Sequence, residues 1–184
     1  MNRKNNQFAY NWIYYLLVVI ISIASWVFAF NMYHLPKDYE SIKLFYSGTV
    51  IDYDFKDKVL DNFDNIVSFE IQSANPDDNI FKSKYSLVGF NGCDVLLLTL
   101  DVIEQTACEE VFVELEDNYG LSYYVQQDKN YGIILSNENK NNLSSYFEFK
   151  ETDYVITIAA SSVNAGDITN NAYDFIKWIL SYEN

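Results

Sequence analysis

An apolar run near the start is the longest regular pattern in the sequence. Residues 8–33 contain no charged side chain, and Trp12 to Phe30 are almost entirely apolar. At about 1.5 Å of rise per residue, roughly 20 apolar residues in a helix cross a hydrocarbon core about 30 Å thick. The pattern therefore predicts a transmembrane helix over 8–33. A short N-terminus, 1–7, precedes it, and a polar linker, 34–41, follows it.

After the linker, short apolar segments alternate with helical patterns. The run that follows Asp94 is unbroken, which is typical of a strand covered on both faces of a parallel sheet. The alternation predicts β-α-β units. The expected strands are Ile42–Tyr46, Ile66–Ile71 and Asp94–Leu100, and the expected helices are Asp54–Phe63, Asn79–Leu87 and Asp101–Cys108.

From Tyr123 the pattern becomes rich in strands and ends in a helix. Strands are expected at Tyr123–Gln126, Tyr131–Leu135 and Tyr154–Ala159, a polar loop at Asn137–Ser145, and an amphipathic helix around Ala172–Leu180. About 150 residues support one core more readily than two, so we expect these strands to join the main sheet. The predicted fold class is α/β: one N-terminal transmembrane helix, then one three-layer domain, 42–184, with a mainly parallel sheet.

Charge predicts the orientation of the chain. The 26 Asp and Glu residues all follow Lys37, whereas Arg3 and Lys4 precede the apolar run. Basic residues beside a membrane segment favour the cytoplasmic side. We therefore expect a single-pass protein of the cell membrane, with a cytoplasmic N-terminus and an extracellular acidic domain.

A cleaved signal peptide is the alternative interpretation of the same segment, because it also has a basic start and an apolar stretch. Its apolar region has about 7 to 15 residues, fewer than this chain has. We therefore favour an uncleaved signal anchor.

The order of several segments resembles bacterial extracellular solute-binding proteins. The resemblance covers the soluble part of the chain and rests on Asp94–Leu98 leading into a short acidic helix, Tyr131–Ile133, Tyr154–Ile158 with Ser161–Gly166, and the terminal helix with Ala172–Lys177. Proteins of that family usually have two lobes and about twice this length. The resemblance thus implies a reduced, one-lobe relative, and it assigns no binding residue to this chain.

Catalytic motifs are missing from the sequence. The single histidine, His34, lies in the linker, and there is no Gly-x-Ser-x-Gly, phosphate loop or His-Glu-x-x-His motif. We expect no enzyme, cofactor or metal site. The turn Asn75–Asn79 is rich in the oxygen ligands that calcium favours, but it lacks the spacing of an EF-hand, and we interpret it as a turn that caps the next helix. Nucleic-acid binding is not expected, because it requires clustered Lys and Arg.

Two cysteines and several tyrosines are the remaining candidates. Cys93 and Cys108 flank a strand and a helix, which allows either a disulfide or two unpaired buried thiols. Tyr123, Tyr124 and Tyr131 are candidates for a contact surface or for core packing. The leading hypothesis is a non-catalytic, membrane-anchored extracellular binding or accessory module that holds a partner or a small solute near the membrane. The alternative is a structural or assembly protein that contacts a membrane protein partner.

Overall fold

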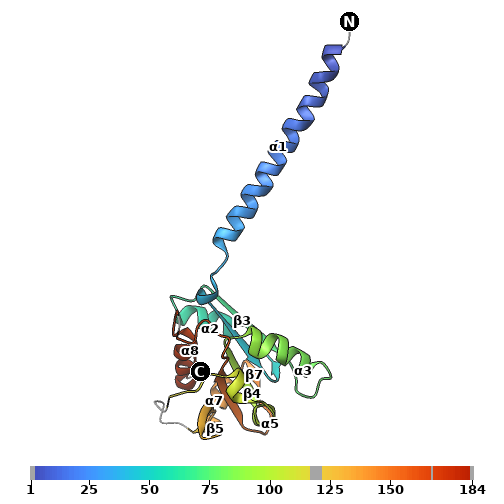
Figure 1. Cartoon of the computed structure of the whole chain (residues 1–184). Helices are drawn as coiled ribbons and strands as arrows, with labels where there is room; N and C mark the ends of the chain where they lie inside the picture. Colours follow the sequence, from blue (N-terminus) through green and yellow to red (C-terminus); the bar gives the residue numbers. More distant parts are fainter. Residues whose placement is uncertain (1–2, 117–121, 167, 183–184) are drawn as a thin grey trace. The chain divides into compact units, whose positions relative to one another are not determined.

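The computed structural model describes residues 3–116, 122–166 and 168–182, which form two compact units that divide after Pro36 (Figure 1). The first unit is one helix, α1 (Arg3–His34), and its segment Trp12–Met32 is long and apolar enough to cross a membrane. The predicted apolar helix is therefore confirmed. A membrane anchor and a signal sequence both have these features.

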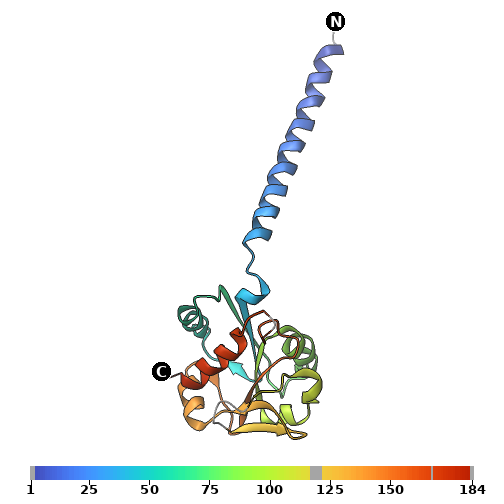
Figure 2. The ribbon, with the colours of Figure 1, turned by 60° about the vertical axis from the view of Figure 1, so that its left-hand side comes forward.

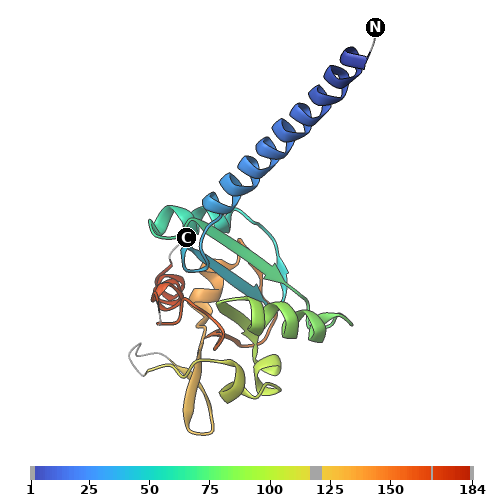
Figure 3. The same cartoon turned by 45° about the horizontal axis from the view of Figure 1, so that its top comes forward.

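The second unit is built on a mixed six-stranded sheet with the order β3-β1-β4-β8-β6-β5. β1 pairs in parallel with β3 and β4, and the two strands β1 and β3 lie side by side in Figure 3. The pairs β4–β8, β6–β8 and β5–β6 are antiparallel. The strands are β1 (Ser41–Tyr46), β3 (Ser68–Ser73), β4 (Val95–Thr99), β5 (Tyr123–Gln126), β6 (Lys129–Ile134) and β8 (Tyr154–Ile158), with a small antiparallel pair β2 (Thr49–Val50) and β7 (Phe147–Glu148).

The prediction of a mainly parallel sheet is wrong for the second half of the domain. β8 is buried along its whole length, as β4 is, yet it runs antiparallel to β4. A continuous apolar run reports that both faces of a strand are covered, and it carries no information about strand direction. The expectation that the later strands join the main sheet is confirmed.

Helices cover both faces of the sheet, so the three-layer α/β architecture is confirmed. Figure 1 shows α2 and α8 on one side and α3 on the other, and Figure 2 gives a second view with α8 in red. The first face carries α2 (Phe55–Asn62), α7 (Asn137–Leu143) and α8 (Asn171–Ser181), and the second carries α3 (Phe81–Lys84), η2 (Tyr85–Gly89), α4 (Phe90–Gly92), α5 (Leu100–Glu104) and α6 (Cys108–Val111). A further short helix, η1 (Asp38–Glu40), precedes β1.

Alternation along the central strand explains the two cores. Successive side chains of a strand point to opposite faces. Val95 and Leu97 of β4 accordingly pack into the core under α2 and α8, whereas Leu96 and Leu98 pack into the core under α3 and α5. All four side chains are fully buried.

Three helical segments differ from their predictions. The expected helix Asp101–Cys108 is divided into α5 and α6, with residues 105–107 between them. α7 lies where a polar loop is predicted, because the Ser136 hydroxyl accepts a hydrogen bond from the Asn139 backbone N–H at 3.1 Å and caps the helix, and Leu143 is buried. The predicted helix Asn79–Leu87 begins later and extends further, since α3, η2 and α4 follow one another from Phe81 to Gly92.

Candidate functional site

The three tyrosines predicted as a contact surface lie in different places. Tyr131 is 3% exposed and belongs to the core under α3 and α5, so it forms no exposed surface. Tyr123 packs against the core under α2 and α8, whereas Tyr124 packs against the opposite core. The structure therefore does not bring the three side chains together on one surface.

Cys93 and Cys108 are both buried and free, so the disulfide is absent from the structure. Cys93 lies just before β4. Cys108 lies beyond the other end of this strand, where its Sγ is 3.9 Å from the carbonyl oxygen of Ile103 in α5. The chain comes back towards the start of β4 at Phe112, which pairs with Ala159. Ala159 in turn donates a backbone hydrogen bond to Asp94, the residue after Cys93. Burial raises the pKa of Cys93 to about 12 and that of Cys108 to about 11, which keeps both thiols protonated at neutral pH.

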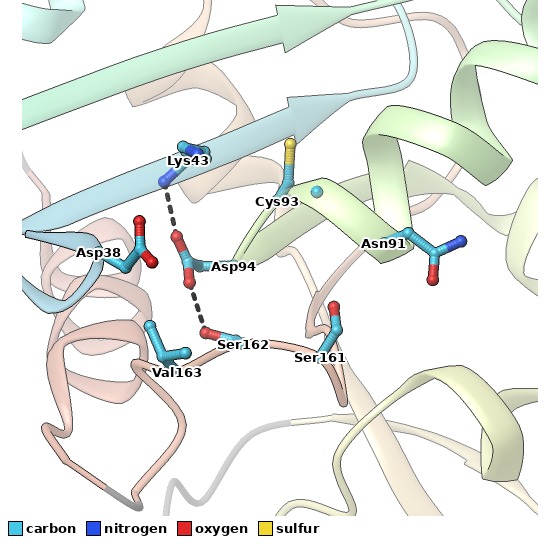
Figure 4. A pocket seen from close by; sticks show the side chains of 9 residues that line it. Asp38, Lys43, Asn91, Cys93, Asp94, Ser161, Ser162 and Val163 are labelled. Atoms are coloured by element: carbon cyan, nitrogen blue, oxygen red, sulfur yellow. Dashed lines mark hydrogen bonds between the residues drawn. The ribbon is translucent and has the colours of Figure 1, made fainter.

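Asp94 is the centre of a polar network at the amino edge of β1 and β4. Its carboxylate accepts hydrogen bonds from the Lys43 backbone N–H at 2.9 Å, from the Ser162 hydroxyl, and from the Asn164 amide at 3.0 Å. Figure 4 shows Asp94 between Lys43 and Ser162, on the wall of a small cavity of about 220 Å³. The Asn164 amide also donates to the Ser41 carbonyl oxygen at 2.9 Å.

The polar groups of this network are used by the fold itself. Asp94 is only 8% exposed, and its hydrogen bonds join β1, β4 and the loop that follows β8. The cavity is also smaller than the roughly 300–1,000 Å³ typical of small-molecule sites. We therefore assign Asp94, Ser162 and Asn164 a structural role.

A larger groove of about 600 Å³ lies at the opposite, carboxyl edge of the parallel strands. One wall comes from the loop after β3 and the first turns of the following helix, and the other comes from α5 and the turn after it. Ligands of open α/β sheets bind outside the carboxyl ends of the strands. Both its volume and its place in the fold make this groove the candidate site.

Aromatic side chains form the apolar part of the groove. The rings of Phe81 and Tyr85 are stacked, with centroids 5.7 Å apart and planes 8° apart. The Tyr85 and Thr106 hydroxyls share a hydrogen bond of 3.0 Å, which connects the two walls. Burial, the largest cause, raises the pKa of Tyr85 to about 12, so its hydroxyl stays neutral at physiological pH. Val102 and Pro76 add further apolar surface.

Polar side chains surround the apolar part. They are Asp77, Asp78, Asn79, Lys82, Asp101 and Gln105. The Asn75–Asn79 turn contributes three of them. The interpretation of this turn as a helix cap is wrong, because Ile80 occupies the N-cap position of α3 and no side chain caps that helix. The sequence does not indicate that Asp101–Thr106 lies opposite this turn, because only the crossover from β3 to β4 brings the two segments together.

The groove has no recognisable metal centre. Across residues 3–116, 122–166 and 168–182, no three His, Cys, Asp or Glu side chains form a group that could hold a metal ion. Comparison of the chain with protein-family models, with curated proteins and with solved structures gave no match.

Proposed function

We propose that this chain is a membrane-anchored, non-catalytic binding module that holds a small solute in the carboxyl-edge groove. The observation that carries the proposal is the groove itself, with a volume of about 600 Å³, a stacked aromatic wall and a polar rim. This combination of apolar surface and a few convergent polar groups is typical of ligand sites. The absence of catalytic motifs from the sequence favours binding without chemistry.

The proposal assigns α1 the role of an uncleaved anchor. Its apolar segment has 21 residues, and the positions of Arg3 and Lys4 favour a cytoplasmic N-terminus with the domain outside. The module would then hold its ligand close to the extracellular surface of the cell membrane.

The resemblance to solute-binding proteins belongs to the same proposal. A single α/β lobe with an open groove is consistent with a reduced, one-lobe relative of that family. With only one wall of the usual cleft, such a protein would bury less of its ligand than a two-lobe protein does.

The test is thermal unfolding of the full chain in a non-ionic detergent, with a panel of sugars, amino acids, short peptides, simple amines and calcium. A ligand at a hundredfold excess over Kd stabilises the folded state by about 2.7 kcal/mol. For a domain of this size, that raises the midpoint by about 5 to 10 °C.

Two matched variants locate the effect. Val102→Trp fills the groove and should abolish the rise in midpoint, whereas Val125→Trp, at an exposed position on β5, should preserve it. A flat response across the panel would contradict the proposal and favour the alternative of an assembly protein.

A further inference from the structure

The entry segment of the domain, residues 38–41, is held by hydrogen bonds from distant parts of the chain. α1 ends at His34 and the domain begins at Lys37, so Leu35 and Pro36 are the residues between the two units. The entry segment then forms η1 and reaches the start of β1 at Ser41. A helix as short as η1 leaves carbonyl groups without partners inside the helix, so their donors must come from elsewhere.

Asn171, the first residue of α8, supplies one of these donors. Its side-chain amide donates a hydrogen bond to the Tyr39 carbonyl oxygen at 2.9 Å. Its side-chain oxygen accepts a hydrogen bond from the Asn65 amide at 2.6 Å, which fixes the orientation of the Asn171 side chain. The Glu40 carbonyl oxygen accepts from the Val67 backbone N–H at 2.7 Å. Asn171 is 3% exposed, which keeps water away from its hydrogen bonds.

Asn164, in the loop after β8, supplies the other donors. Its side-chain amide donates to the Ser41 carbonyl oxygen at 2.9 Å and to the Asp38 carbonyl oxygen at 3.3 Å. Its side-chain oxygen accepts a hydrogen bond from the Thr169 hydroxyl at 2.8 Å, and Asn164 is fully buried. Every carbonyl group of the entry segment therefore has a donor from outside it, and two buried asparagine side chains supply most of them.

We infer that Asn164 and Asn171 lock the entry segment onto the domain, so that the chain after α1 has no flexible stalk and the domain resists release by proteases. If residues 35–41 were all free, they could span up to about 24 Å, whereas Leu35 and Pro36 alone span about 7 Å. Proteases cleave where exposed backbone can open, and the lock holds this backbone closed. The inference holds whether or not the groove binds a ligand.

Asn171→Asp tests the lock with the least disturbance. An ionised aspartate keeps the shape of the side chain and an oxygen for the Asn65 amide, but it cannot donate to the Tyr39 carbonyl oxygen. A negative charge in the first turn of α8 also favours the helix. Asn164→Ala is the second variant, and Asn141→Ala, at an exposed position of α7, is the control.

The measurement is proteolysis of the full chain in a non-ionic detergent at pH 8, with an endoproteinase that cleaves after lysine. Lys37 is exposed next to the entry segment, whereas Lys43 lies within β1, so cleavage after Lys43 reports opening of the sheet itself. The unmodified chain and Asn141→Ala should resist cleavage after Lys37. Both lock variants should be cleaved there about tenfold faster or more, ahead of Lys43, since cleavage follows the population of the opened segment.

Amide hydrogen exchange gives a second readout, which does not depend on access of the protease through the detergent. The Glu40 backbone N–H donates to the Lys37 carbonyl oxygen at 2.8 Å within the locked turn. This N–H should exchange about tenfold faster in Asn171→Asp and Asn164→Ala than in the unmodified chain, and its exchange should be unchanged in Asn141→Ala.

Three results would overturn the inference. The first is that cleavage and exchange are both unchanged in the two lock variants. The second is cleavage after Lys37 and Lys43 at equal rates, because the entry segment would then open only together with the whole domain. The third is faster exchange at Glu40 without faster cleavage, which would remove protease resistance as a consequence of the lock.

Discussion

The side-chain amide of Asn164 donates a hydrogen bond of 3.0 Å to the carboxylate of Asp94, and both side chains are buried. The same amide group lies 2.9 Å from the Ser41 carbonyl oxygen. One side chain from the loop after β8 thereby holds the starts of β1 and β4 together. This contact fixes the amino edge of the sheet, opposite the groove.

We predict that Asn164→Ala lowers the free energy of unfolding by about 2 kcal/mol, because buried acceptors lose their partner. For a domain of this size, the thermal midpoint should fall by about 4 to 8 °C. Asn141→Ala is the control, since Asn141 is exposed on α7, and it should change the midpoint little. An unchanged midpoint for Asn164→Ala would show that this network contributes little to stability.

A close approach between β6 and β8 gives a second prediction. A Cβ atom added at Gly132 would collide with Val155 Cγ1 and lie 3.0 Å from the Ile156 carbonyl oxygen. We expect Gly132→Ala to destabilise the domain by about 2 kcal/mol or more, as overpacked cores do. At Gly92 the nearest contact for an added Cβ is 3.5 Å, so Gly92→Ala should be tolerated. Equal denaturant midpoints for the two variants would contradict the packing of β6 on β8.

The thiol of Cys93 predicts how stability changes at high pH. Burial raises its pKa from 9.0 to about 12 in the folded state, so between these values the unfolded chain releases a proton that the folded chain keeps. Stability from this group is present below pH 9 and is lost as the pH rises towards 12. Urea unfolding at pH 8 to 11 should show this decline, and Cys93→Ala should make it shallower. An identical slope in the variant would argue that Cys93 is not buried.

The proposed topology is tested by labelling single added cysteines in intact cells with a membrane-impermeant maleimide. The two native thiols are buried and should stay unlabelled. Glu151→Cys, at an exposed position of the domain, should label in intact cells, whereas Asn5→Cys should label only after lysis. The opposite pattern would reverse the orientation, and a mature chain whose mass lacks α1 would identify a cleaved signal peptide.

Much of the fold follows from local patterns in the sequence. β1, β4 and α8 lie close to where apolar runs and helical spacing predict them. The direction of β8 does not follow, because burial of both faces gives the same apolar run in parallel and antiparallel strands. α7 is missed because its asparagine-rich sequence has low helix propensity, although Ser136 and Asn139 form a capping box.

The groove is harder to predict from the sequence than the fold is. The turn Asn75–Asn79 stands out by its composition, but its partner segment, Asp101–Thr106, looks like an ordinary short helix and its end. Their proximity depends on β3 and β4 ending at the same edge of the sheet with β1 between them. The sequence also does not distinguish the buried Tyr131 from the more exposed Tyr123 and Tyr124, because the burial of Tyr131 depends on how β6 pairs with β8.

Hydrogen–deuterium exchange of the full chain shows whether a ligand lies in the carboxyl-edge groove. The exchange is measured with and without the panel compound that raises the unfolding midpoint most. A ligand in this groove should slow exchange in peptides covering 76–85 and 101–106, with no change at 161–163 beside Asp94. Protection confined to 91–94 and 161–163, or unchanged exchange at both sites, would contradict it.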